Sequence, residues 1–335
     1  PSAPKCCLID WTLRMTTSAK SRADSVQKVT SPGGIEAWLV EDYAVPLVAF
    51  EFAFHGGTTQ DTPAKAGAVS MLSALLDEGA GPYDADTFHR AMDDKAVEIS
   101  FSSDRDTFHG RMKTLARHLD DDAIERVRSQ MVAGLKRELK DPDALAGKAW
   151  REAAFGAHPY GMASRGTLDS VPAITRDDLI NLRQRIMARG NLKIAVVGAI
   201  SAATLSPLLD KVFSALPATG QLTPISDVEM AGLGTKQIID LDVPQSTIRF
   251  GLPGLKRDDA DFWPAVVVNH ILGGGVFSAR LFREVREKRG LAYSVHSQLI
   301  TFDHAALFSG GTSTKNERAA ESLSVIEEEI EKLAT

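Results

Sequence analysis

A strand-and-helix pattern that occurs twice is the feature of this chain that most constrains its fold. Stretches of alternating apolar and polar residues within 36–55 precede an apolar helical pattern at 67–77. After residues 217–236, which are rich in Gly, Thr, Pro and Ser, the same order returns at 237–252 and 259–272. We therefore predict an α+β fold of two homologous αβ modules, each a mostly antiparallel sheet with helices packed on one face.

The repeat also predicts the domain boundaries. Residues 1–29 are polar and lack the apolar segment of a signal peptide, so we expect an arm outside the fold. The first module is expected at 30–216 and the linker at 217–236. The second module is expected at 237–335. The whole chain of 335 residues is long enough for two domains.

Composition excludes several classes of function. The net charge is −6 and no long basic run occurs, which disfavours a nucleic-acid partner. No window holds about 20 uninterrupted apolar residues, so no membrane span is predicted. The two cysteines, Cys6 and Cys7, are adjacent, which gives neither a disulfide framework nor a cysteine metal site.

A glycine loop followed by a basic helix carries the strongest functional pattern. Gly273, Gly274 and Gly275 precede the helix, and no Gly-Lys-Ser/Thr follows them, so a phosphate-binding loop is disfavoured against a flexible turn. Near the helix end, Arg286 and Tyr293 lie seven residues apart. Two such donors suit a carbonyl oxygen or a developing oxyanion. The alternative is an ordinary basic residue on a solvated helix face and an ordinary strand aromatic.

The longer string at residues 278–294, S-A-R-L-F-x-x-x-R-x-x-x-G-L-A-Y-S, is similar to the second-domain pattern of the M16 (insulinase/pitrilysin-like) zinc peptidases, with Ala279 as one extra residue. The resemblance runs from about Thr30 to the C-terminus and implies a LuxS/MPP-like metallohydrolase fold. It also implies that Arg286 and Tyr293 bind the substrate near the scissile carbonyl. It places the three glycines beside the substrate path.

The zinc motif of that family is missing from this chain. By the resemblance, the positions of H-x-x-E-H fall on Ser70, Ser73 and Ala74, and the distal Glu falls near Ala133 and Gly134. None of these residues can do the work of the ligand or the base that it replaces. None of the eight histidines lies three or four residues from another on one helix. We therefore predict no metal site in this chain.

Smaller M16 enzymes work as pairs in which one chain carries zinc and the other supplies the Arg and Tyr. The resemblance therefore implies a non-catalytic subunit of a heterodimeric M16 zinc peptidase, inactive alone, with a peptide substrate and with zinc in the partner subunit. A periplasmic location is expected, as for many bacterial pairs of this size.

Two other functions remain open at this stage. The chain could be a structural core-type subunit of a larger complex without peptidase function. It could also be a hydrolase that uses Ser70 or Ser73, although no Gly-x-Ser-x-Gly surrounds either. The strand predicted at 96–102 either pairs with an extended peptide or is a plain edge strand.

Overall fold

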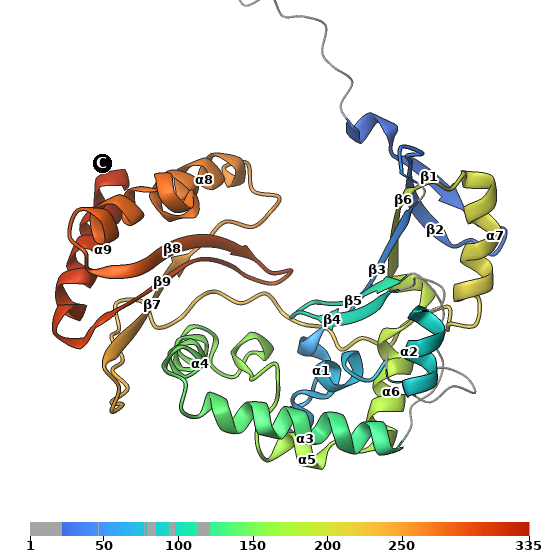
Figure 1. Ribbon diagram of the computed structural model, residues 1–335, viewed down its shortest axis with the longest axis horizontal. Helices are drawn as coiled ribbons and strands as arrows, with labels where there is room; N and C mark the ends of the chain where they lie inside the picture. The colour runs from blue at the N-terminus through green and yellow to red at the C-terminus, as the bar shows by residue number, and fades with distance from the viewer. Residues whose placement is uncertain are drawn as a thin grey trace, which may run out of the picture.

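The computed structural model describes residues 22–45, 47–76, 78, 85–93, 98–112 and 121–334. Figure 1 shows two sheets, one built from each half of the chain, each with helices packed against it. The predicted arm at 1–29 lies mostly outside the described residues. Its last part is β1 (Gln27–Thr30), which pairs with the next strand and buries Val29, so the sheet begins inside the predicted arm.

The first sheet has six strands in the order β1-β2-β6-β3-β5-β4. Only the β2–β6 pair is parallel; the other pairs are antiparallel, as predicted. After β1, its strands are β2 (Glu36–Glu41), β3 (Val48–His55), β4 (Ile99–Ser103), β5 (Thr107–Met112) and β6 (Leu192–Gly198). Strict alternation in β6 buries every second side chain, because one face of the sheet meets the core.

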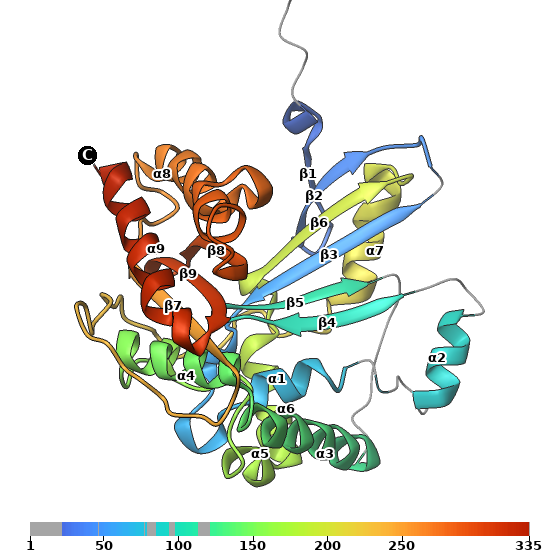
Figure 2. The same cartoon turned by 60° about the vertical axis from the view of Figure 1, so that its left-hand side comes forward.

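Four helices of the first half supply side chains to the core on that face (Figure 2): α1 (Ala68–Ser73), α3 (Asp121–Glu138), α6 (Arg176–Ile186) and α7 (Ala202–Phe213). The other described α-helices of this half are α2 (Ala85–Asp93), α4 (Pro142–Phe155) and α5 (Ser170–Ala173). Leu39, Phe54 and Phe108 of the sheet are fully buried against Leu72 and Leu179 of the helices. None of the described helices is both long and apolar enough to cross a membrane.

The second sheet has three strands in the order β7-β9-β8. They are β7 (Gln245–Pro253), β8 (Ala292–Thr301) and β9 (Ala306–Lys315), with α8 (Phe262–Asn269) and α9 (Ala319–Ala334) beside them. The strand predicted at 237–242 is wrong: these residues pair with no described strand, and Ile238 is 79% exposed. An alternating pattern becomes a strand only where a neighbour pairs with its main-chain groups.

The two sheets repeat one packing detail. Phe52 of β3 lies opposite Gly110 of β5, and a Cβ on that glycine would lie 2.1 Å from the ring. Phe250 of β7 lies opposite Gly310 of β9, where the same distance would be 2.2 Å. In each half, therefore, a phenylalanine ring occupies the space that only glycine leaves.

The halves are joined by α4, which packs on the second sheet. Along β7, Phe250 belongs to the apolar cluster of the second half, whereas the neighbouring Gly251 approaches Trp150 of α4, with 2.5 Å between a built Cβ and the indole. Successive residues of a strand point to opposite faces. The second sheet is therefore covered by its own helices on one face and by α4 on the other (Figure 1).

Candidate functional site

A buried carboxylate fixes the start of α1, the helix on which the zinc-motif positions lie. Asp61 is 8% exposed, and its two carboxylate oxygens accept hydrogen bonds from the main-chain N–H groups of Gly67 (2.9 Å) and Val69 (3.0 Å). Burial raises the pKa of Asp61 to about 7, although these N–H donors oppose the shift. Gly67 precedes the helix at φ 93°, a conformation that favours glycine.

The hydroxyl groups of the two serines of α1 both donate hydrogen bonds to main-chain carbonyl oxygens. Ser70 donates its hydroxyl proton to the carbonyl oxygen of Ser164 (2.8 Å), and Ser73 donates to the carbonyl oxygen of Ser70 (2.8 Å). Ala74 follows as the helix C-cap. No described histidine contacts either hydroxyl, so nothing in this part of the chain activates a serine nucleophile.

An arginine lies where the resemblance places the distal zinc ligand. A Cβ on Gly134 of α3 would be 3.3 Å from Nη2 of Arg165, whose Nη1 binds Glu138 at 2.5 Å. A guanidinium there repels a metal cation. Among the described residues, no three His, Cys, Asp or Glu side chains gather as metal ligands. No sequence pattern pointed to Arg165, because only the fold brings it to α3.

Arg286 and Tyr293, the predicted substrate-binding pair, lie against each other. Arg286 is in the π-helical turn Phe282–Glu287, and its Cζ lies 4.7 Å from the ring centroid of Tyr293 and 4.7 Å from that of Phe282. Tyr293 is 83% exposed at the start of β8, where the pairing with β9 is irregular. A guanidinium over aromatic faces at this distance makes favourable cation–π contacts.

Arg286 also differs from its basic neighbours in lacking a carboxylate. Glu284, which is 8% exposed, binds Arg283, Lys288 and Arg289. These hydrogen bonds, above all that from Lys288, lower the pKa of Glu284 to about 2. Arg280 binds Glu329. Within the described part of the chain, Arg286 forms no ion pair or hydrogen bond through its side chain. It is therefore not one of several equivalent charges on a solvated face.

The glycine run Gly273–Gly275 has a packing role. A Cβ on Gly273 would lie 2.6 Å from the main-chain N of Ser297 in β8, and one on Gly275 would lie 2.7 Å from the carbonyl oxygen of His270. A side chain at Gly274 would meet Asn269 at 2.8 Å. The turn therefore needs small residues to approach the strand, and the substrate contact predicted for these glycines stays a prediction.

The strand predicted at 96–102 corresponds to β4 (Ile99–Ser103). Residues 96 and 97 of the prediction lie outside the described residues. β4 stands last in the sheet order, and no described strand pairs with its outer edge. That edge presents main-chain donors and acceptors at the spacing an extended peptide requires.

The sequence is similar to those of known proteins. Residues 173–335 match the family model described as the peptidase M16 inactive domain. The chain is 28% identical to an uncharacterized zinc protease of Streptomyces coelicolor, over 92% of this chain and 72% of that protein. It is 24% identical to the non-peptidase homolog YmxG of Helicobacter pylori, over 87% and 72% of the two chains.

Solved structures show the same fold. The peptidase M16 inactive domain of Pseudomonas fluorescens superposes with a TM-score of 0.84 at 26% identity, covering 92% of this chain and 78% of that one. A protease of Helicobacter pylori gives a TM-score of 0.78 at 17% identity, over 92% and 82% of the two chains.

Proposed function

Because this chain belongs to the M16 peptidase family and is a non-catalytic member of it, we propose that it is one subunit of a heterodimeric zinc peptidase. In this proposal the partner subunit carries zinc, and Arg286 and Tyr293 of this chain bind the substrate peptide beside it. The observation that carries the proposal is the stacked, carboxylate-free guanidinium of Arg286.

The chemistry of the pair suits a peptide carbonyl. A guanidinium offers several N–H donors in one plane, and the phenol of Tyr293 offers one O–H donor. Stacking on Tyr293 and Phe282 restricts the rotamers of Arg286, so little side-chain entropy is lost when a ligand binds. The partner's zinc would supply the activated water.

The experiment mixes this chain with a zinc-bearing M16 partner and measures cleavage of a labelled peptide. Arg286→Gln and Tyr293→Phe each remove a donor while keeping most of the packing volume. Loss of one such donor typically costs about 2.7–4 kcal/mol of transition-state stabilisation, which is a fall of about a hundredfold or more in kcat/KM. Equal kcat/KM for the wild type and both variants would end the assignment.

Arg257 provides a matched control. Its Cζ lies 4.9 Å from the ring centroid of Phe262 and 4.8 Å from that of Trp263, so it is also an arginine that contacts two aromatic rings of the second half. Arg257→Gln makes the same change of charge and stacking away from Arg286. Cleavage by this variant should equal that of the wild type.

The alternative, a structural subunit of a larger complex, gives a different result. In that case the mixture with a zinc-bearing partner gains no cleavage activity that depends on Arg286 or Tyr293. The same assay therefore separates the two functions.

A further inference from the structure

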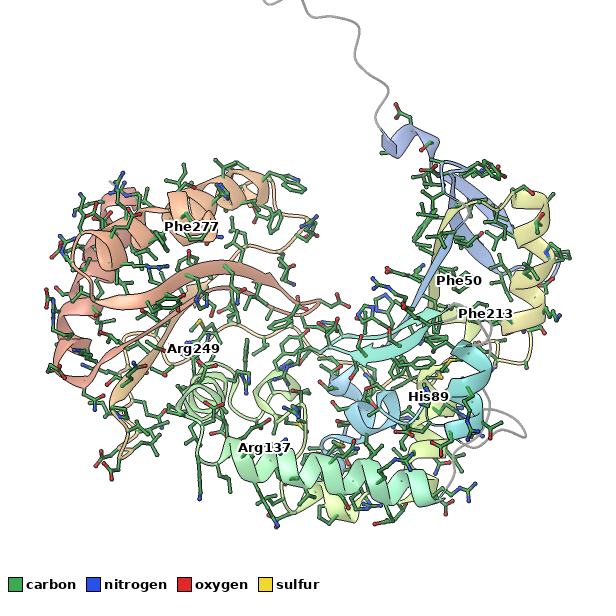
Figure 3. The ribbon with its side chains drawn as sticks, viewed as in Figure 1. Phe50, His89, Arg137, Phe213, Arg249 and Phe277 are labelled. Carbon is green, nitrogen blue, oxygen red and sulfur yellow. The ribbon has the colours of Figure 1, made fainter. Side chains whose placement is uncertain are left out.

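An exposed phenylalanine adjoins the contacts around Arg286. Phe277 is 73% exposed, and its ring packs edge-on against that of Phe282, with centroids 5.2 Å apart and an interplanar angle of 87°. Phe282 in turn contacts the guanidinium of Arg286, which also contacts Tyr293. We call these four residues the Arg286 cluster. Figure 3 shows Phe277 in the helical layer of the second half, on the side of the second sheet away from α4.

One buried ring links the exposed members of the Arg286 cluster. Phe282 is buried, whereas Phe277 and Tyr293 are exposed. Edge-to-face aromatic pairs and cation–π contacts at these distances are both favourable. A single exposed phenylalanine is ordinary on a protein surface. Phe277 differs because it shares its neighbour Phe282 with Arg286, which the described part of the chain leaves without a carboxylate.

The main chain holds Phe277 in a closed turn. Phe277 lies in the 3₁₀ turn Val276–Ser278. Both the main-chain N–H and the hydroxyl of Ser278 donate to the carbonyl oxygen of Gly275, at 3.2 Å and 3.0 Å. The N–H of Gly275 donates to the carbonyl oxygen of His270 at 2.9 Å, which joins the turn to the preceding helical residues. The turn is therefore formed before a ligand arrives, and a ligand that covers the ring loses little affinity to ordering it.

We propose that Phe277 forms an apolar subsite for a large apolar side chain of the substrate peptide. The inference rests on the proposed function, since it adds a side-chain preference to the carbonyl contact of Arg286. Because the two contacts that link Phe277 to Arg286 measure 5.2 Å and 4.7 Å, the ring lies within about 10 Å of the guanidinium. An extended peptide advances about 3.3 Å per residue. The side chain in the subsite therefore belongs to a residue within about three positions of the bound carbonyl.

A peptide can satisfy both parts of this surface at once. One of its carbonyl oxygens accepts from the guanidinium, and a nearby apolar side chain covers the exposed ring of Phe277. An aromatic side chain gains buried apolar area and a favourable ring contact together. A polar side chain at the same place would lose water without gaining a hydrogen bond, and a basic one would also be repelled by Arg286. The subsite therefore favours large apolar residues.

The test uses the mixture of this chain with a zinc-bearing M16 partner and a labelled peptide that the mixture cleaves. Each residue within about three positions of the scissile bond is changed in turn to Phe, Leu and Ser. We expect one position at which kcat/KM is about tenfold higher for Phe than for Ser, as for one ring buried in an aromatic contact. The Leu peptide should lie between them, because leucine buries apolar area but has no ring.

Two variants of Phe277 and one control isolate the subsite. Phe277→Ala should lower kcat/KM for the Phe peptide far more than for the Ser peptide, so that the two become nearly equal, and Phe277→Leu should keep part of the preference. The side chain is exposed, so both variants should melt as the wild type does.

Trp263→Ala is the matched control. Trp263 is likewise exposed, and it packs edge-on against the buried ring of Phe262 at 5.5 Å. Among the ring contacts of the described residues, none joins Trp263 to the Arg286 cluster. Trp263→Ala should therefore keep the full preference for the Phe peptide.

The outcomes separate this inference from the function beneath it. If cleavage depends on Arg286 but shows no preference for large apolar residues, or if Phe277→Ala keeps the preference, the subsite is wrong and the proposed function stands. If Phe277→Ala keeps the preference and weakens the association of the two chains in sedimentation analysis, Phe277 contacts the partner subunit and the subsite is equally wrong. If no cleavage depends on Arg286, the proposed function and the subsite both fail.

Discussion

Replacing Tyr160 by phenylalanine should loosen the joint between the two halves of the molecule. Tyr160 is fully buried, and its hydroxyl donates to Asp106 at 2.8 Å and accepts the main-chain N–H of His304 at 2.9 Å. Asp106 belongs to the first half, and His304 lies in the turn between β8 and β9 of the second. The main-chain N–H of Asp303, in the same turn, donates to Asp106 at 3.0 Å.

The expected loss in the free energy of unfolding follows from the hydrogen bonds that the Tyr160 hydroxyl makes. Phenylalanine keeps the ring contacts with Phe155 and Phe302, whose centroids lie 5.6 Å and 4.6 Å away, so no cavity forms. A hydrogen bond to a charged group contributes about 1.5–3 kcal/mol, and an unpaired buried N–H costs about 1–3 kcal/mol. His304 is only half-buried, so water replaces part of that second loss. We expect Tyr160→Phe to cost about 2–4 kcal/mol in all.

Amide hydrogen exchange can measure this loss of stability residue by residue. Protection should fall at the turn between β8 and β9, and the amides of β6 in the first core should keep theirs. Tyr43→Phe is the control, because Tyr43 is 62% exposed and its hydroxyl donates only to the nearby Glu41. The reasoning fails if exchange at the turn changes no more in Tyr160→Phe than in Tyr43→Phe.

Three further predictions concern stability and metal binding. Burial raises the pKa of Asp61 to about 7 from its usual value of about 4, so the folded chain binds this proton more tightly than the unfolded chain does. The contribution to the free energy of unfolding should therefore fall as pH rises from about 4 to about 7, and urea titrations of Asp61→Asn should lack this fall. Gly310→Ala should cost about 1–3 kcal/mol in the same titration, because its Cβ would lie 2.2 Å from the ring of Phe250. A variant with the family's ligands restored should hold no stoichiometric zinc by elemental analysis until Arg165→Ala is added, since the guanidinium repels the ion. Its substitutions are Ser70→His, Ser73→Glu, Ala74→His and Gly134→Glu; tight zinc binding with Arg165 in place would contradict this explanation.

Local sequence patterns predicted the elements that depend on local rules. Alternation of apolar and polar residues within 36–55 identified β3, and the spacing of Arg286 and Tyr293 identified a pair that the fold brings into contact. The strand predicted at 237–242 failed because its pattern is compatible with a strand but no described neighbour pairs with it. The helix predicted at 67–77 ends at Ser73, since an apolar composition does not specify where a buried helix stops.

Local sequence patterns could not predict which charged residues define the sites. Arg165 meets Gly134 only because the loop before α5 folds back on α3, and no spacing in the sequence records that contact. Likewise, Arg286 stands apart from its basic neighbours only once Glu284 and Glu329 are seen to bind the others. Which charges lack a partner is a property of the tertiary structure, and it is this property that singles out Arg286.

The loss of zinc ligands also had to be compatible with the fold. By the resemblance, the metal of an active relative joins the helix equivalent to α1 to the helix equivalent to α3. Here one short segment makes that connection instead: the carbonyl oxygen of Ser164 accepts the hydroxyl of Ser70 on α1, and the next residue, Arg165, binds Glu138 on α3. The helices therefore stay joined through hydrogen bonds and an ion pair. By the resemblance, a guanidinium therefore stands where an active relative would hold its metal cation, and the chain keeps the fold of the family around it.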